Sequence, residues 1–209
     1  MSGKLAWQGT LLAVQPRIRL LRSFDEIHHA YLGYALRVDG HIDGESECFS
    51  LGIGKAAQAR FAFRVGLRVE GFCEPVADPL KETVDYYKVS GLALLDDTEP
   101  SNETTPPWFG VPPALEEYRT RGHRRLDPRT YKSKCSQCIW GCHMPVEMIV
   151  DHWNPSKKRY RDETFCYGPK SCPLYRAGPN RKVPGRNGAV WIEEDWVEQD
   201  MTAHRGPDD

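Results

Sequence analysis

The chain has 209 residues, with 28 Lys and Arg against 29 Asp and Glu, and 40% of its residues are hydrophobic. This length predicts one or two small domains, and the hydrophobic fraction is sufficient for a folded core. No stretch reaches the roughly 20 apolar residues that a membrane-spanning helix needs, so we expect no membrane insertion. The first residues lack the apolar run and cleavage site of a secretory signal, which favours a cytoplasmic protein.

The net charge is near zero, but the charges are unevenly distributed. Residues 119–186 contain 16 Lys and Arg against 5 Asp and Glu, so the rest of the chain is acidic. The overall isoelectric point therefore says little about partners. We expect a basic unit and an acidic unit within one chain.

The first 95 residues are predicted to form a run of strands with one short helix. Apolar and polar residues alternate in five segments, as in half-buried strands. In the first segment the alternation is Thr10, Leu12 and Val14, and Pro16 is expected at a bulge or an edge. The second segment is predicted to end at the turn dipeptide Asp39-Gly40. The five segments are residues 7–20, 32–38, 49–53, 65–69 and 86–95, and good helix formers fill residues 55–61.

The order strand, strand, strand, helix, strand, strand is that of the OB-fold, a five-stranded and partly open barrel. Residues 63–71, Phe-Arg-Val-Gly-Leu-Arg-Val-Glu-Gly, also resemble the entry to the fourth strand of OB-like barrels. The resemblance covers residues 7–95 and implies a mainly β fold, with an OB-like barrel at residues 1–95. An SH3-like barrel and a generic β-sandwich are the alternatives.

The remaining chain is predicted to contain a linker, a second unit and a tail. Residues 96–113 are acidic and Pro-rich, and such a segment buries too little apolar surface to offset its ordering entropy. Trp108 and Phe109 interrupt this linker and are candidates for docking onto a folded unit. Residues 114–190 are predicted to form a small, mostly irregular and basic cysteine-rich metal-binding module, and residues 191–209 an acidic tail.

Five of the seven cysteines lie within 38 residues, whereas Cys48 and Cys73 stand alone. In a reducing compartment such a cluster indicates a metal more often than disulfides. Thiolates suit zinc and iron–sulfur clusters far better than magnesium or calcium, and most such sites use four ligands. One thiol is therefore predicted to be spare among Cys135, Cys138, Cys142, Cys166 and Cys172.

The phrase Cys-Ser-Gln-Cys-Ile-Trp-Gly-Cys at residues 135–142, followed by Cys166, resembles the N-terminal [4Fe–4S] segment of molybdopterin oxidoreductases. This local resemblance implies a cluster held by Cys135, Cys138, Cys142 and Cys166, and it does not extend to the catalytic body of that family. Zinc is the alternative, with Cys172 replacing Cys142 as a ligand. A small basic module is expected to need its metal to fold.

Cations alternate with aromatic rings between Cys142 and Cys166 and just beyond. Lys and Arg neutralise phosphates, and aromatic faces stack on unpaired bases. With an OB-like barrel in the same chain, this pattern predicts a non-catalytic protein that binds single-stranded DNA or RNA, with the metal fixing the loop at residues 143–165. The predicted contacts are Trp153, Lys157, Lys158, Arg159, Tyr160, Arg161, Tyr167, Lys170, Arg17 and Tyr34.

Two other functions fit the same sequence. A protein–protein adaptor with a structural metal site is one, because aromatic residues beside a metal loop often form only its small core. An iron–sulfur protein for electron transfer or redox sensing is the other. No phosphate loop, nucleophile elbow or Cys–His pair indicates catalysis, and His28-His29 is predicted to lie in a loop between the first two strands.

Overall fold

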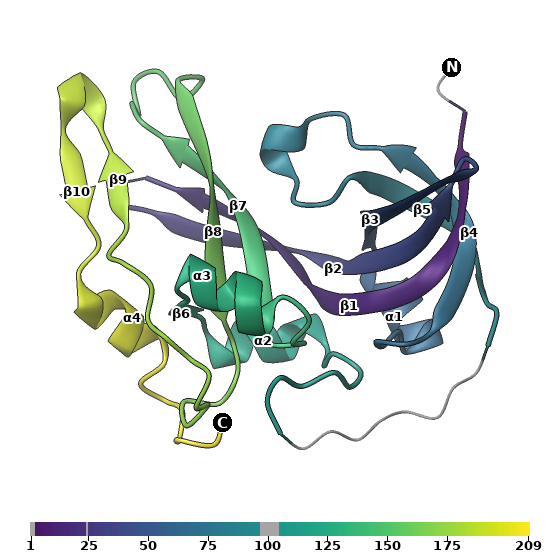
Figure 1. Cartoon of the computed structure of the whole chain (residues 1–209). Coiled ribbons are helices and arrows are strands. Elements are labelled where there is room, and N and C mark those ends of the chain that lie inside the picture. Colours follow the sequence, from purple (N-terminus) through teal and green to yellow (C-terminus); the bar gives the residue numbers. More distant parts are fainter. Residues whose placement is uncertain (1–2, 24, 97–104) are drawn as a thin grey trace.

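The computed structural model describes residues 3–23, 25–96 and 105–209 (Figure 1), so residues 97–104 of the predicted linker at residues 96–113 lie outside the described residues. The described residues form a mainly β structure, as predicted. No helix among them is long and apolar enough to cross a membrane. The strands are β1 (Leu5–Arg22), β2 (Ile27–Ile42), β3 (Glu45–Ile53), β4 (Arg68–Pro75), β5 (Tyr86–Leu94), β6 (Arg124–Arg125), β7 (Gly141–Ile149), β8 (Lys158–Cys166), β9 (Lys182–Pro184) and β10 (Val190–Ile192). The helices are α1 (Lys55–Phe61), α2 (Leu115–Arg121), α3 (Pro128–Thr130) and α4 (Asp195–Met201), with a π-helical turn at Tyr131–Cys135 and short 3-10 turns at Pro79–Lys81 and Arg186–Gly188.

Strands β1 to β5 close into a ring, which we call the strand ring. β1 pairs antiparallel with both β2 and β4, β2 pairs with β3, and β4 pairs with β5. A parallel contact between β3 and β5 completes the order β1-β2-β3-β5-β4. Apolar side chains fill the interior, among them Leu11, Val14, Leu36, Val38, Leu51, Leu67 and Val69.

The buried face of β1 differs from the one predicted. Trp7 and Leu11 are buried, whereas Thr10 and Leu12 are only half-buried. The pairing with β2 shifts register between Leu11 and Ala13. An irregularity of this kind moves the following side chains to the other face of the strand, so simple alternation across it fails.

The predicted turn at Asp39-Gly40 is wrong, because β2 continues to Ile42. The hairpin instead turns at Asp43 and Gly44, whose φ angles are 51° and 88°. Gly40 has a different role, since a Cβ there would lie 2.1 Å from the carbonyl oxygen of Gln8 on β1. Two Asp-Gly pairs therefore follow each other closely, and only the second one forms the turn.

The cysteine-rich half of the chain is built onto the same sheet. Residues 20–22 of β1 pair in parallel with residues 146–148 of β7, and β8 joins β7 to β6. Figure 1 shows the long β1 and β2 running from the strand ring to the β7–β8 hairpin. The predicted acidic tail also packs here, because Asp195 and Glu198 of α4 form ion pairs with Arg125 of β6 at 2.5 and 2.6 Å. Where the sequence predicted an irregular module, strands shared with the ring order this half.

Candidate metal centre and binding groove

Four of the five clustered cysteines lie around one another. Cys135, Cys138 and Cys166 belong to one small buried cluster. Cys172 is close enough for its charge to raise the pKa of each of the other three thiols. We call these four residues the thiol cluster. It joins the turn before β7 to the end of β8 and the loop that follows, so two separated segments of the chain contribute to it.

Without a metal ion, the surroundings of the thiol cluster disfavour the negatively charged thiolate form of its cysteines. Burial raises the pKa of Cys135 to about 12 and that of Cys138 to about 11, and repulsion between neighbouring thiolates adds to both. Burial also raises the pKa of Cys166. A bound metal ion removes this penalty, because its charge offsets the repulsion and coordination deprotonates the thiols.

Backbone N–H groups are already directed at two of the sulfurs. Against the dominant effect of burial, a hydrogen bond from the backbone of Trp140 lowers the pKa of Cys138, and one from Gly168 lowers that of Cys166. Each donor stands two residues after its cysteine. Such hydrogen bonds favour the thiolate, which is the form that binds metal.

Gln15 of β1 holds the turn that contains Cys135 and Cys138. Its buried Nε2 donates to the carbonyl oxygens of both cysteines, at 2.9 and 2.8 Å. The Tyr131 hydroxyl donates to its Oε1 at 2.7 Å. A Cβ at Gly141 would lie 2.5 Å from the carbonyl oxygen of Cys135, so a glycine is required there. Sequence analysis did not identify Gln15, whose only signal is a polar residue within a predicted strand.

Three partly or fully buried arginines surround the Cys166 side of the thiol cluster. Arg124 Nη2 lies 3.8 Å from Cys166 Sγ, and both Arg124 and Arg205 donate to the carbonyl oxygen of Gly168. Burial, followed by repulsion from Arg121 and Arg124, lowers the pKa of Arg205 to about 10. Each of the three arginines has at least one buried nitrogen without a hydrogen-bond partner among the described residues. A four-thiolate centre with zinc or a [4Fe–4S] cluster has a net charge of about −2 and would offset this positive charge.

Cys142 does not lie in the thiol cluster. Its Sγ donates to the carbonyl oxygen of Pro16 at 3.3 Å, and it packs in the main hydrophobic core. Burial raises the pKa of Cys142, which keeps the thiol protonated. Cys142 therefore lies apart from the other ligands implied by the iron–sulfur resemblance, whereas Cys172 lies near them.

The donor set and its charged surroundings fit a thiolate metal centre, but the sulfurs are not yet arranged around a common point. Within the described part of the chain, no three His, Cys, Asp or Glu side chains form a group that could hold a metal ion. Metal binding therefore requires the side chains of the thiol cluster to turn toward one another.

Four of the predicted nucleic-acid contacts are engaged within the protein. Arg17 forms a two-pronged ion pair, Tyr34 and Lys170 donate to backbone carbonyl oxygens, and Tyr167 is fully buried. These side chains stabilise the fold and are not available as a contact surface. An aromatic or cationic side chain in a predicted strand can face the protein interior or the solvent, and alternation alone does not show which.

The other six predicted contacts lie on the β7–β8 hairpin and the turn at its tip. Trp153 at the tip is 85% exposed, but Lys158 and Tyr160 bind Glu147, and Arg161 binds a carboxylate of β8. Strand pairing orders this hairpin, in place of the metal that was predicted to fix residues 143–165. The tip is also remote from the thiol cluster, because nine-residue strands span about 30 Å. The exposed contacts that remain are Trp153, Lys157 and Arg159.

A groove of about 530 Å³ separates the outer face of β2 and β3 from the segment that contains the first cysteines. Arg37 of β2 lies on one wall and Lys132 on the other, and the exposed Arg129 and Lys134 flank Lys132 along the chain. Residues 128–146 contain no Asp or Glu. The lining also includes Gln15, Ser50, Asp85, Tyr131, Ser136 and His143.

His28 and His29 lie in β2 and not in the predicted loop. His29 packs against His123, with ring centroids 4.7 Å apart. Burial lowers the pKa of His29 to about 4 and that of His123 well below its usual value, so both imidazoles are neutral at pH 7. They are part of the packing between β2 and the cysteine-rich half.

We compared the chain with protein-family models, with curated proteins and with solved structures. None of these comparisons gave a significant match.

Proposed function

We propose that this protein is a non-catalytic OB-like barrel that binds single-stranded nucleic acid in the groove beside β2 and β3. The ring order β1-β2-β3-β5-β4, with a parallel β3–β5 contact and α1 between β3 and β4, supports the OB-like assignment. OB-folds bind oligonucleotides on the face of their second and third strands. The observation that carries the proposal is the position of the groove on this face.

The charges at the groove suit a polyanion. Arg37 and Lys132 both line it, and Lys132 and Lys134 lie in a stretch, residues 128–146, that contains no Asp or Glu. Asp127 stands two residues before Arg129 at the start of this stretch. Asp85 is the acidic side chain in the lining, and it accepts hydrogen bonds from the Ser50 backbone N–H and hydroxyl at 2.8 and 2.6 Å. Cations of this kind neutralise phosphates, and an arginine plane also stacks on unpaired bases.

The thiol cluster and the groove share one turn of the chain. Tyr131, Lys132 and Ser136 line the groove, and they belong to the same turn that presents the first two cysteines. We propose that Cys135, Cys138, Cys166 and Cys172 hold a structural metal ion. Zinc is favoured over an iron–sulfur cluster, because Cys142 lies outside the set. Such an ion supplies folding free energy and a fixed turn, and no redox step is needed.

Fluorescence anisotropy with labelled single-stranded DNA and RNA of about 12 nucleotides, within the site size of one OB-fold, tests this function. The double variant Arg37→Ala/Lys132→Ala should bind more weakly and lower the salt slope by about 0.7 per lost phosphate contact. Lys55→Ala, an exposed cation on α1, is the matched control and should bind as the wild type does. Absent or salt-independent binding by the wild type would contradict the proposal.

A protein–protein adaptor is the second candidate, and one observation favours it. β10 exposes apolar residues in succession, with Val190 57% and Ile192 55% exposed, and Trp196 of α4 is 64% exposed. β10 pairs only with β9 among the described residues, so one of its edges is free to pair with another strand. Sedimentation velocity of the wild type against Ile192→Asp tests self-association through this strand.

A further inference from the structure

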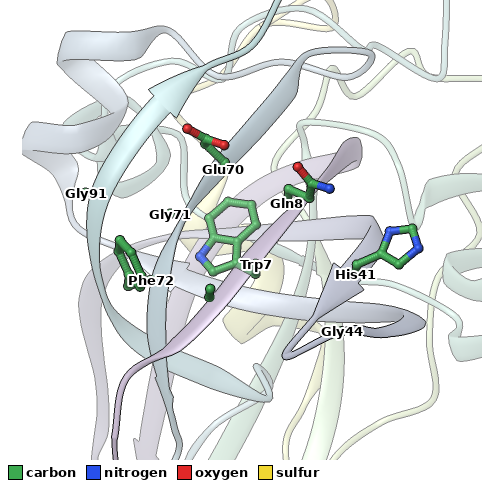
Figure 2. A pocket seen from close by; sticks show the side chains of 9 residues that line it. Trp7, Gln8, His41, Gly44, Glu70, Gly71, Phe72 and Gly91 are labelled. Carbon is green, nitrogen blue, oxygen red and sulfur yellow. The ribbon is translucent and has the colours of Figure 1, made fainter.

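A second hollow, of about 420 Å³, lies where β1, β2 and β4 run side by side (Figure 2). The Trp7 ring lies at its centre and is almost fully buried, while Phe72 at its side is 46% exposed. Glycines keep the hollow open: a Cβ at Gly91 would come within 3.0 Å of the Phe72 ring, and Gly71 has no side chain to cover the indole. The hollow is large enough for one planar ring.

Three hydrogen-bonding side chains stand in a row across this hollow. Gln8 of β1 is directly opposite His41 of β2 and Glu70 of β4, so the three exposed side chains are neighbours. Figure 2 shows Gln8 and Glu70 near the Trp7 ring and His41 farther out, beyond Gln8. Among the described residues, none of these three side chains forms a hydrogen bond or ion pair with the rest of the protein. Their polar atoms are thus available to a ligand.

The composition of the hollow selects for one kind of ligand. The exposed Phe72 ring offers a face for stacking, as in other proteins that bind unpaired bases. The Glu70 carboxylate accepts N–H donors and repels phosphate, while the Gln8 amide can donate to a carbonyl oxygen. Guanine presents two neighbouring N–H donors and a carbonyl oxygen on one edge, whereas adenine presents a single amino group there.

We propose that this hollow binds an unpaired guanine base, stacked on Phe72 and bonded along its edge by Glu70 and Gln8. The inference rests on the proposed function, because the base would belong to the same single strand. Arg37 in the groove and His41 at the hollow are both exposed on β2 and stand four residues apart. Four residues of a strand span about 13 Å, so one nucleic-acid chain can cross from the groove to the hollow.

The test uses free nucleotides as well as oligomers, so that the two sites are measured separately. Calorimetric titration of the wild-type protein should show tighter binding of guanosine 5′-monophosphate than of the adenosine, cytidine and uridine monophosphates. Glu70→Gln should reduce the preference for guanine over adenine by about tenfold, and Phe72→Ala should weaken guanosine binding by about tenfold. The matched controls are Glu116→Gln and Leu80→Ala, an exposed carboxylate and an exposed apolar residue outside the hollow.

The outcomes separate this inference from the proposed function. Arg37→Ala/Lys132→Ala should weaken oligomers and leave guanosine monophosphate binding unchanged. If oligomers bind in a salt-dependent way but show no preference for guanine, and if Glu70→Gln and Phe72→Ala have no effect, the hollow is not a base site and the groove stands. If the free nucleotide binds at the hollow and no oligomer binds, base binding in the hollow is supported and nucleic-acid binding in the groove is contradicted.

Discussion

Gln15 Nε2 lies 2.9 Å from the carbonyl oxygen of Cys135, and this hydrogen bond ties the strand ring to the thiol cluster. The same amide also reaches the carbonyl oxygen of Cys138 at 2.8 Å. Because Gln15 also lines the groove, one buried side chain contacts both of the features that we assign to function. Loss of Gln15 is therefore expected to affect both the wall of the groove and the metal-binding turn.

Replacing Gln15 by leucine should destabilise the protein and weaken metal binding. The change removes three hydrogen bonds and leaves the Tyr131 hydroxyl without its acceptor, while each carbonyl oxygen keeps one backbone N–H donor, from Cys138 and from Gly141. The cost is about 2–4 kcal/mol in the free energy of unfolding. Urea denaturation measures the stability, and competition with a chelator measures the metal affinity. Gln137→Leu is the control, because Gln137 is exposed in the same turn. Equal metal affinity in the wild type and Gln15→Leu would contradict the role that we assign to Gln15.

Removing the metal should weaken nucleic-acid binding in the groove. Without it, the turn that bears Lys132 must be ordered when the ligand binds, at a cost of about 2 kcal/mol or roughly 30-fold in Kd. The measurement is anisotropy before and after treatment with a chelator and a reductant, with metal content checked by mass spectrometry. An unchanged Kd after complete metal loss would show that the groove does not depend on the thiol cluster.

Acid should destabilise the protein through His29. Its pKa is lowered from 6.5 to about 4, so the unfolded chain binds more protons than the folded protein between these two pH values. Stability is therefore unaffected by this group above pH 6.5 and falls as the pH drops from there to 4, by about 3 kcal/mol in total. Urea midpoints across this range measure the loss. His29→Gln should reduce the slope, and a slope equal to that of the wild type would contradict this role of His29.

The sequence predicted the mainly β character and the order of strands and helix along residues 1–95 correctly, because alternation and one short helical segment are local signals. Convergence of thiols from two distant segments on one metal centre stays a prediction, because no three such side chains are grouped to hold an ion among the described residues. Turn and register details were missed where two Asp-Gly pairs competed and where β1 contains an irregularity. Turns and register depend on which two strands lie against each other, as Gly40 of β2 lies against Gln8 of β1. The sequence of one strand does not identify its partner strand.

The sequence contains a pattern that distinguishes Cys142 from Cys172 as a candidate metal ligand. Cys142, Met144, Val146 and Met148 alternate along β7, and all four are buried in the main core. Period-two alternation places Cys142 on the core face of a strand, away from the preceding turn. The groove had no such signal, because its walls come from segments more than 80 residues apart, at Arg37 and Lys132.

The most direct test of the metal centre is the metal content of three proteins purified without oxygen: the wild type, Cys172→Ala and Cys142→Ala. We predict one zinc per chain in the wild type and in Cys142→Ala, and loss of the metal in Cys172→Ala. Cys142→Ala should be less stable than the wild type, because it opens a cavity in the core. A brown protein that loses its iron in Cys142→Ala and keeps it in Cys172→Ala would contradict this assignment, and so would a folded wild type without bound metal.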